Sequence, residues 1–149
     1  MVYKHPTIYT IGYEGLPIDE FITRARNNKI DVVIDVRELP WSRKNGFNRN
    51  ALHRRFEEEK ISYFNFTELG SPRPTRNKLY EKHNYVEFFK SYSIYLSNYV
   101  ESLMDIITIS RKMRICLMCY EADIQKCHRK IITDKLRELD KGLKIASLN

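Results

Sequence analysis

The chain has few cysteines, glycines and prolines, and it has no long apolar run. Its 149 residues include three cysteines, five glycines and five prolines, which excludes disulfide scaffolds, collagen-like chains and linker-rich proteins. No apolar run reaches the roughly 18–20 residues that a membrane-spanning helix needs. Residues 1–6 also lack the apolar core of a secretory signal. We therefore expect a cytoplasmic protein with reduced cysteines and no membrane partner.

Positive charge exceeds negative charge. The 26 lysines and arginines outnumber 19 aspartates and glutamates, giving a formal net charge of +7, and 42% of the residues are hydrophobic. Such a composition is typical of a globular protein. Its charge attracts polyanions, chiefly nucleic acid, and phosphorylated small molecules. The alternative is a basic surface without a specific partner.

Strand and helix patterns alternate along residues 1–149, which we interpret as one domain. Short β-branched or aromatic runs predict strands at 7–11, 30–36, 62–66, 114–118 and 143–148. The alternation predicts an α/β fold: a mostly parallel sheet of about five strands with helices on both faces, a Rossmann-like three-layer sandwich.

Helical spacing of apolar residues predicts three helices. The first begins at about residue 18, behind Pro17. The second follows an apolar stripe from 85 to 107, and the third runs from about 126 to 139. Asn50 is a candidate cap for a fourth helix that carries Leu52 and Phe56. Residues 67–83 contain Gly70, two prolines and few apolar residues, so we interpret them as a long loop.

Ligands of open parallel sheets bind beyond the carboxyl ends of the strands. This rule selects the segments 12–15, 35–48, 67–76 and 119–129. The last of them joins a strand to a helix and carries Cys119, Glu121, Cys127, His128 and Arg129. We expect these five residues to form the working surface of the protein.

The segment 119–129 has the residue types of nucleophilic catalysis. A helix N-terminus and nearby cations favour a thiolate or a bound phosphate. Either Cys119 or Cys127 is a candidate nucleophile, with His128 as its base and Glu121 as an orienting acid. The alternative is that both cysteines are small buried hydrophobes and His128 only packs.

A Cys-x-x-Cys pair followed by Cys-His superficially offers four zinc ligands. However, Cys116 and Cys119 lie in one predicted strand, where side chains three positions apart point to opposite faces. We therefore predict no metal site and no Cys-x-x-Cys redox motif. We also predict no resident cofactor.

The segment 35–55 is basic and carries two aromatic residues. Six lysines and arginines stand between residues 37 and 55 against the single acid Glu38, with Trp41 and Phe47 among them. Aromatic rings beside cations suit a base and its phosphate. The alternative is a solvated surface on which the aromatic residues pack the loop. Asp35 ends an apolar strand, so it is either an anchor for Arg37 or Arg129 or a part of the site.

Short motifs along the chain resemble the family called domain of unknown function 488 (DUF488). In order they are Tyr9–Gly12, Asp35–Arg37 with Pro40 and Ser42-Arg43, Phe47-Asn48, Glu68–Gly70, Leu117–Glu121 and Cys127–Arg129. The resemblance implies an α/β fold with these motifs clustered at one end of the sheet, and it implies no particular function. The chain departs from the family pattern after Gly12, where Tyr13-Glu14 replaces His-Ser. It departs again where Ser71 replaces a second glycine and where a proline before Cys127 is missing.

Three functions remain open. The first is an enzyme acting on a nucleotide or nucleic acid, and the second is a non-catalytic module that binds nucleic acid or a modified nucleotide. The third is sulfur transfer, because Ile34–Arg37 and a cysteine after a later strand faintly resemble rhodaneses, although no glycine lies between Cys119 and Arg129.

Candidate substrate or phosphate contacts are Gly12, Tyr13, Asp35, Arg37, Arg43, Phe47, Asn48, Glu68 and Gly70. The sequence leaves the oligomeric state open.

Overall fold

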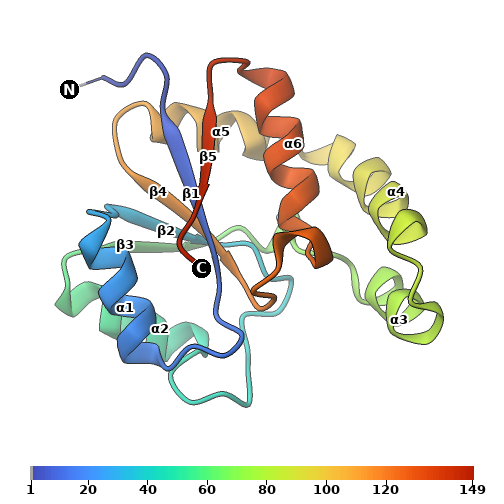
Figure 1. The fold of residues 1–149 in the computed structure, drawn as a ribbon, viewed down its shortest axis with the longest axis horizontal. Coiled ribbons are helices and arrows are strands. Elements are labelled where there is room, and N and C mark those ends of the chain that lie inside the picture. Colours follow the sequence, from blue (N-terminus) through green and yellow to red (C-terminus); the bar gives the residue numbers. More distant parts are fainter. Residues whose placement is uncertain (1) are drawn as a thin grey trace.

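A five-stranded parallel sheet forms the centre of the computed structural model, which describes residues 2–149 (Figure 1). The strands are β1 (Thr7–Gly12), β2 (Val32–Asp35), β3 (Ser62–Asn65), β4 (Ile115–Cys119) and β5 (Lys144–Ser147). They pair in the order β3-β2-β4-β1-β5, and every pairing is parallel. The predicted α/β fold of Rossmann-like type is confirmed.

Helices cover both faces of the sheet. They are α1 (Ile18–Asn27), α2 (Arg49–Glu58), α3 (Arg73–Lys82), α4 (Tyr85–Leu96), α5 (Val100–Ser110) and α6 (Arg129–Leu139). Helices α1 and α2 pack on the face that presents Val33 and Cys116. Helices α4, α5 and α6 pack on the opposite face, which presents Ile34, Leu117 and Cys119.

Strand β4 lies between β1 and β2 although it comes much later in the chain. All of its residues are buried, as are all of those in β2, because each strand is covered on both faces. The register pairs Gly12 with Cys119 and Asp35 with Met118. The carboxyl ends of β1, β2 and β4 therefore meet at one edge of the sheet.

The prediction of a long loop over 67–83 is wrong. A short 3-10 helix spans Thr67–Leu69, and α3 occupies Arg73–Lys82. Pro74 is the second residue of α3, a position where the missing N–H costs no hydrogen bond. The prolines therefore mark the beginning of a helix.

The predicted single helix over 85–107 is interrupted between α4 and α5 by a 3-10 turn at Ser97–Tyr99. The Ser97 hydroxyl donates to the Ile94 carbonyl at 2.5 Å, and the Asn98 amide donates to the Tyr95 carbonyl at 3.1 Å. These side chains compete with the backbone for helical carbonyls.

Two helix beginnings also differ from the sequence predictions. Asn48 rather than Asn50 precedes α2. Helix α6 begins at Arg129 rather than near Lys126, because residues 124–126 form a separate 3-10 turn. Cys127 and His128 therefore lie immediately before the helix.

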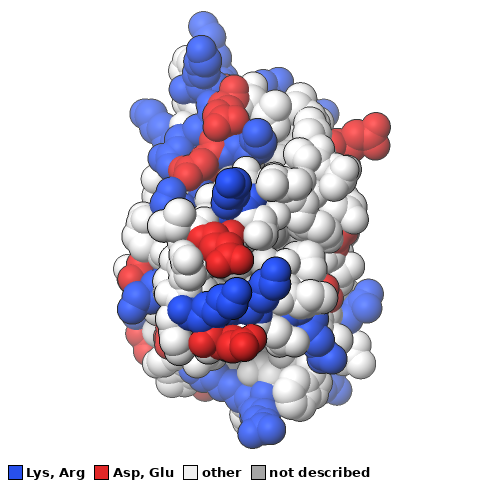
Figure 2. Space-filling model, turned by 90° about the vertical axis from the view of Figure 1, so that its right-hand side faces the viewer, with Lys and Arg blue, Asp and Glu red and all other residues white. Residues whose placement is uncertain are grey.

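Surface charges of both signs are mixed on the face that α3 and α4 form. Figure 2 shows lysine and arginine side chains interspersed with aspartates and glutamates there. On the neighbouring helix α6, Lys130 and Asp134 pair with each other at 2.8 Å. Within residues 2–149, no helix combines the length and the apolar character needed to cross a membrane.

Candidate active site

Two cysteines meet beyond the end of β4. Cys119 is the last residue of that strand, and Cys127 precedes α6, yet their sulfur atoms lie 2.7 Å apart. Both residues are 1% exposed. Burial and the neighbouring Cys127 sulfur raise the pKa of Cys119 well above its usual range, while Arg129 acts in the opposite direction. Cys119 therefore rests as a neutral thiol at neutral pH.

Glu121 provides the acceptor for the Cys119 thiol. The Cys119 sulfur donates to Oε2 of Glu121 at 3.1 Å. Gly12 makes this arrangement sterically allowed, because a Cβ at that position would overlap the backbone carbonyl of Glu121. The small residue that ends β1 thus lets the segment after β4 pass close to it.

Arg129 and His128 surround the second sulfur. The backbone N–H of Arg129 donates to the Cys127 sulfur at 3.4 Å, and its Nε donates at 3.3 Å. Nε2 of His128 lies 2.8 Å from the Val36 carbonyl, which can only accept. Nε2 therefore carries the proton in neutral His128, and the unprotonated Nδ1 lies 3.7 Å from the Cys127 sulfur.

Arg129 is only 1% exposed, and it keeps its charge. Burial acts to lower the pKa of Arg129, but the sulfurs of Cys119 and Cys127 outweigh burial and raise it. The guanidinium also donates to the backbone carbonyl of Glu121. One buried cation therefore connects both cysteines to the backbone of the segment between them.

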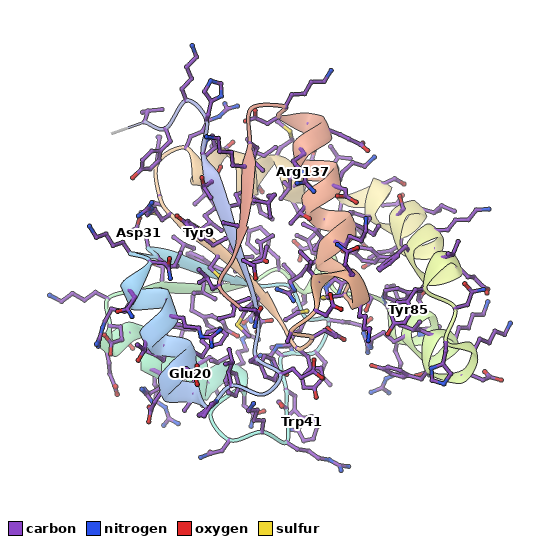
Figure 3. The ribbon with its side chains drawn as sticks, in the orientation of Figure 1. Tyr9, Glu20, Asp31, Trp41, Tyr85 and Arg137 are labelled. Carbon is purple, nitrogen blue, oxygen red and sulfur yellow. The ribbon has the colours of Figure 1, made fainter. Side chains whose placement is uncertain are left out.

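A cavity of about 240 Å³ opens beside Cys119. It is lined by Tyr13, Arg37, Glu38, Leu39, Trp41, Ser71, Arg76, Tyr80, Cys119, Tyr120, Glu121 and His128. Trp41 lies on the loop after β2, beyond the strand ends (Figure 3), and its side chain is 57% exposed. We call this cavity the Cys119 pocket; Cys127 lies behind its wall.

Asp35 and Arg37 form a buried ion pair at one side of the pocket. Nη2 of Arg37 lies 2.6 Å from Oδ2 of Asp35, and Tyr63 donates its hydroxyl to the same oxygen at 2.5 Å. Burial and the charge of Asp35 raise the pKa of Tyr63, so this hydroxyl stays protonated. Nη1 of Arg37 donates to the Phe47 carbonyl at 2.8 Å and to the Tyr13 hydroxyl at 3.2 Å. This geometry corresponds to the anchoring alternative for Asp35.

The remaining predicted contacts lie at different depths. The ring of Phe47 is buried and stacks on Tyr13 at 4.4 Å, whereas Arg43 is exposed and does not line the pocket. Asn48 accepts a hydrogen bond from the Ser42 backbone at 2.8 Å.

Two further predicted contacts support the neighbouring chain segments. Glu68 accepts from the Ser102 hydroxyl at 2.9 Å. Gly70 allows a close approach of the backbone at Glu38. Neither residue lines the Cys119 pocket.

Sequence reasoning missed Tyr80 because it placed this residue in a loop. Arg76 and Tyr80 stand four residues apart on α3, one helical turn, and both line the pocket. The helical spacing of Tyr80 from Arg76 is the signal that could have found Tyr80. Tyr120 was missed as well, although it directly follows Cys119.

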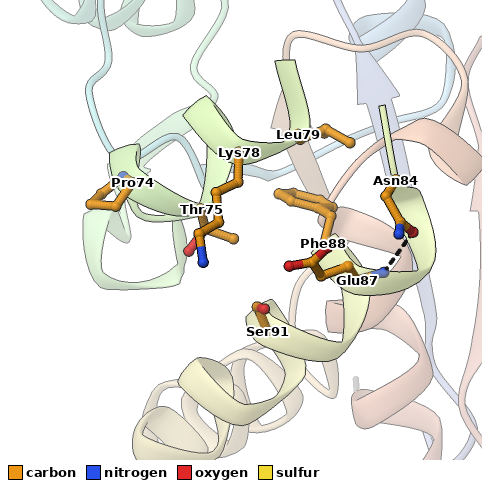
Figure 4. Close-up of a pocket in the computed structure, with 8 residues that line it drawn as sticks. All are labelled: Pro74, Thr75, Lys78, Leu79, Asn84, Glu87, Phe88 and Ser91. Atoms are coloured by element: carbon orange, nitrogen blue, oxygen red, sulfur yellow. Dashed lines mark hydrogen bonds between the residues drawn. The ribbon is translucent and has the colours of Figure 1, made fainter. Parts of the chain in front are cut away.

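A second cavity, of about 110 Å³, lies between α3 and α4. Figure 4 shows Phe88 and Leu79 in its wall, with Asn84 accepting a hydrogen bond from the backbone of Glu87. None of the predicted site residues lines this cavity.

A metal ion would find three donors here. The ligand atoms of Cys119, Cys127 and His128 lie within 4.8 Å of one another, and Cys116 points to the opposite face of the sheet, as predicted. However, two sulfurs bound tetrahedrally to one zinc at about 2.3 Å stand roughly 3.8 Å apart. At 2.7 Å the two sulfurs are too close to share such an ion without moving apart.

The fold and this site define a Rossmann-like α/β protein with a buried cysteine pair at the carboxyl edge of its sheet. The chain belongs to the DUF488 family, described as a domain of unknown function, whose model matches residues 17–136. The motif Tyr9–Gly12 precedes the matched residues. No match was found among curated proteins or among solved structures.

Proposed function

We propose that this protein is an enzyme that acts on a nucleotide bound in the Cys119 pocket. Cys119 is the nucleophile and Glu121 is the base that removes its proton. The observation that carries this proposal is the 3.1 Å contact between the Cys119 sulfur and Glu121 Oε2 in the wall of a cavity. A nucleophile beside an acceptor at a site where a ligand fits is the arrangement that covalent catalysis requires.

Glu121 replaces His128 as the base in this proposal. The unprotonated nitrogen of His128 is directed at Cys127, whereas Glu121 contacts Cys119 directly. Because burial raises the pKa of Cys119, the attack on substrate requires a partner that takes the proton. His128 and Arg129 then position Cys127 behind the nucleophile.

The pocket suits an aromatic ring that carries a phosphate. The exposed side chains of Trp41, Tyr80 and Tyr120 supply the aromatic surface on which a base can stack. The guanidinium of Arg37 donates hydrogen bonds to Asp35, Tyr13 and Phe47. Arg37 therefore holds the pocket wall in place and does not bind the phosphate. Arg76 is the accessible cation, because its pairing with Glu38 at 3.0 Å is partly exposed and can exchange for a phosphate. A cavity of about 240 Å³ admits a single base and no duplex.

The test begins with a thermal-shift panel of nucleoside mono-, di- and triphosphates, followed by a turnover assay on those that bind. Cys119→Ser should abolish turnover and preserve binding. Cys116→Ser is the matched control, because Cys116 lies in the same strand and faces away from the pocket. Glu121→Gln should slow turnover by roughly 10²–10⁴-fold, the usual contribution of a general base. Full turnover by Cys119→Ser would contradict the proposal.

A second candidate is a binding module without chemistry. It is favoured by the formal net charge of +7 and by the neutral resting state of Cys119. It predicts that single-stranded nucleic acid binds with an affinity that falls steeply with salt and is unchanged in Cys119→Ser. Binding that is absent, or that does not respond to salt, counts against this candidate.

A further inference from the structure

The structure brings together two sulfurs that eight residues of sequence separate. The sulfurs of Cys119 and Cys127 lie 2.7 Å apart, and both cysteines are free thiols. An S–S bond is about 2.05 Å long, so a movement of roughly 0.7 Å along the line between the sulfurs would join them. The movement needed to bind one zinc ion is larger, roughly 1 Å in the opposite direction.

The geometry points to a reversible dithiol–disulfide couple made by Cys119 and Cys127, with Cys119 attacking first and Cys127 as the resolving thiol. The reactant that accepts the electrons is a disulfide of a small thiol, such as oxidised glutathione. This inference uses the proposed function only for the order of attack, in which the pocket admits the reactant to Cys119. Disulfide formation itself requires no nucleotide.

The first step is a thiol–disulfide exchange at Cys119. Glu121 takes the thiol proton, and the sulfur attacks one sulfur of the reactant disulfide. A bond forms between Cys119 and that sulfur while the S–S bond of the reactant breaks. The departing half of the reactant takes the proton from Glu121 and leaves as a small thiol, and the other half stays on Cys119 as a mixed disulfide.

The second step closes the protein disulfide. The Cys127 sulfur attacks Cys119, the mixed disulfide breaks, and the second small thiol leaves with the proton of Cys127. In sum, two protein thiols are oxidised and one small disulfide is reduced to two thiols, a transfer of two electrons. Reduction by excess small thiol runs the same steps in reverse.

The surroundings of Cys127 suit a resolving thiol. It does not line the pocket, so a reactant reaches it only through Cys119. The backbone N–H and Nε of Arg129 hold its sulfur against Cys119, and Nδ1 of His128 is placed to accept its proton. Cys116, on the opposite face of the sheet, belongs to a different core cluster and is excluded from the couple.

The experiment incubates the reduced protein with oxidised glutathione, blocks free thiols with an alkylating reagent and maps tryptic peptides without reduction. Trypsin cleaves after Arg114, Lys126 and Arg129, so the disulfide links peptide 115–126 to peptide 127–129. Fragmentation should place the bond on Cys119 and leave Cys116 alkylated. Excess reduced glutathione should restore both thiols.

Variants test the order of attack. Cys127→Ser should accumulate one glutathionyl group on Cys119, because no thiol resolves it. Cys119→Ser should accumulate none on Cys127, which the pocket does not expose. Cys116→Ser should behave as the unchanged protein does. A glutathionyl group on Cys127 of the Cys119→Ser variant would overturn the assigned order.

Three further results would overturn the couple itself. In the first, all three cysteines are still free for alkylation after incubation with oxidised glutathione. In the second, the disulfide involves Cys116. In the third, the disulfide forms only after a chelator has removed a copurified zinc ion. The last result would identify the two cysteines as metal ligands. A protein that turns over a nucleotide and forms no disulfide refutes this inference alone. One that forms the disulfide and binds no nucleotide refutes the proposed function alone.

Discussion

Replacing Asp35 with asparagine tests whether the buried ion pair fixes one side of the site. Asp35 is fully buried and Arg37 is 7% exposed. The carboxylate accepts from the backbone N–H, Nε and Nη2 of Arg37, from the Tyr63 hydroxyl and from the Asn65 amide. Asparagine keeps the shape and removes the charge, so the Arg37 guanidinium is left buried without its counterion.

The expected loss is about 3–5 kcal/mol in the free energy of unfolding, the usual cost of removing one member of a buried pair. In a domain of 149 residues, each kcal/mol lowers the melting temperature by about 2–4 °C, so the midpoint should fall by roughly 10 °C. Urea unfolding followed by circular dichroism measures the free energy, and a thermal scan measures the midpoint.

Two comparisons make this prediction specific. Adding Arg37→Met to Asp35→Asn removes the uncompensated charge, so the double variant should lose less stability than the sum of the single variants. Glu59→Gln breaks the Arg26–Glu59 pair, whose members are 61% and 24% exposed, and should cost at most about 1 kcal/mol. A loss below about 1 kcal/mol for Asp35→Asn would refute the reasoning.

Three other measurements test different parts of the structure. Gly12→Ala should lower both stability and reactivity at Cys119, because its Cβ overlaps the Glu121 carbonyl; unchanged unfolding would contradict that packing. Burial raises the pKa of Cys116 to about 12, so its contribution to stability is constant below the ordinary thiol pKa and is lost as pH rises toward 12. Between pH 8 and 10 this loss is about 1–2 kcal/mol, so over that pH range the free energy of unfolding measured with urea should fall by that much less in Cys116→Ala. Trp41→Ala should weaken nucleotide binding in a titration and leave the melting temperature nearly unchanged, because the ring is exposed in the pocket wall; a large loss of stability would show that the ring packs the loop.

Most of the fold could be predicted from local patterns. The apolar run at 30–36 predicted a strand covered on both faces, and β2 is fully buried. The run at 114–118 predicted a strand, and β4 occupies Ile115–Cys119. Prediction failed where local signals allow two outcomes. Pro74 fits a loop or the first turn of a helix equally well, and only the packing of α3 against α4 decides between them.

The sequence selected residues for the candidate site without showing which of them contact one another. Cys119, Glu121, Cys127 and Arg129 were selected because they share one segment at the carboxyl ends of the strands. The roles assigned to them stay proposals. The sequence could not show that Glu121 contacts Cys119 while His128 contacts Cys127, because spacing along a chain does not fix the distances between side chains of an irregular segment.

The sequence by itself determined the alternation of strands and helices and the opposite orientation of Cys116 and Cys119, since both follow from the period of a strand. The tertiary structure alone decided that β4 lies between β1 and β2, that α3 supplies Arg76 and Tyr80, and that two sulfurs meet. The physical reason is that periodicity fixes the direction of a side chain within its own element. The distance between atoms of different segments depends on how those segments pack.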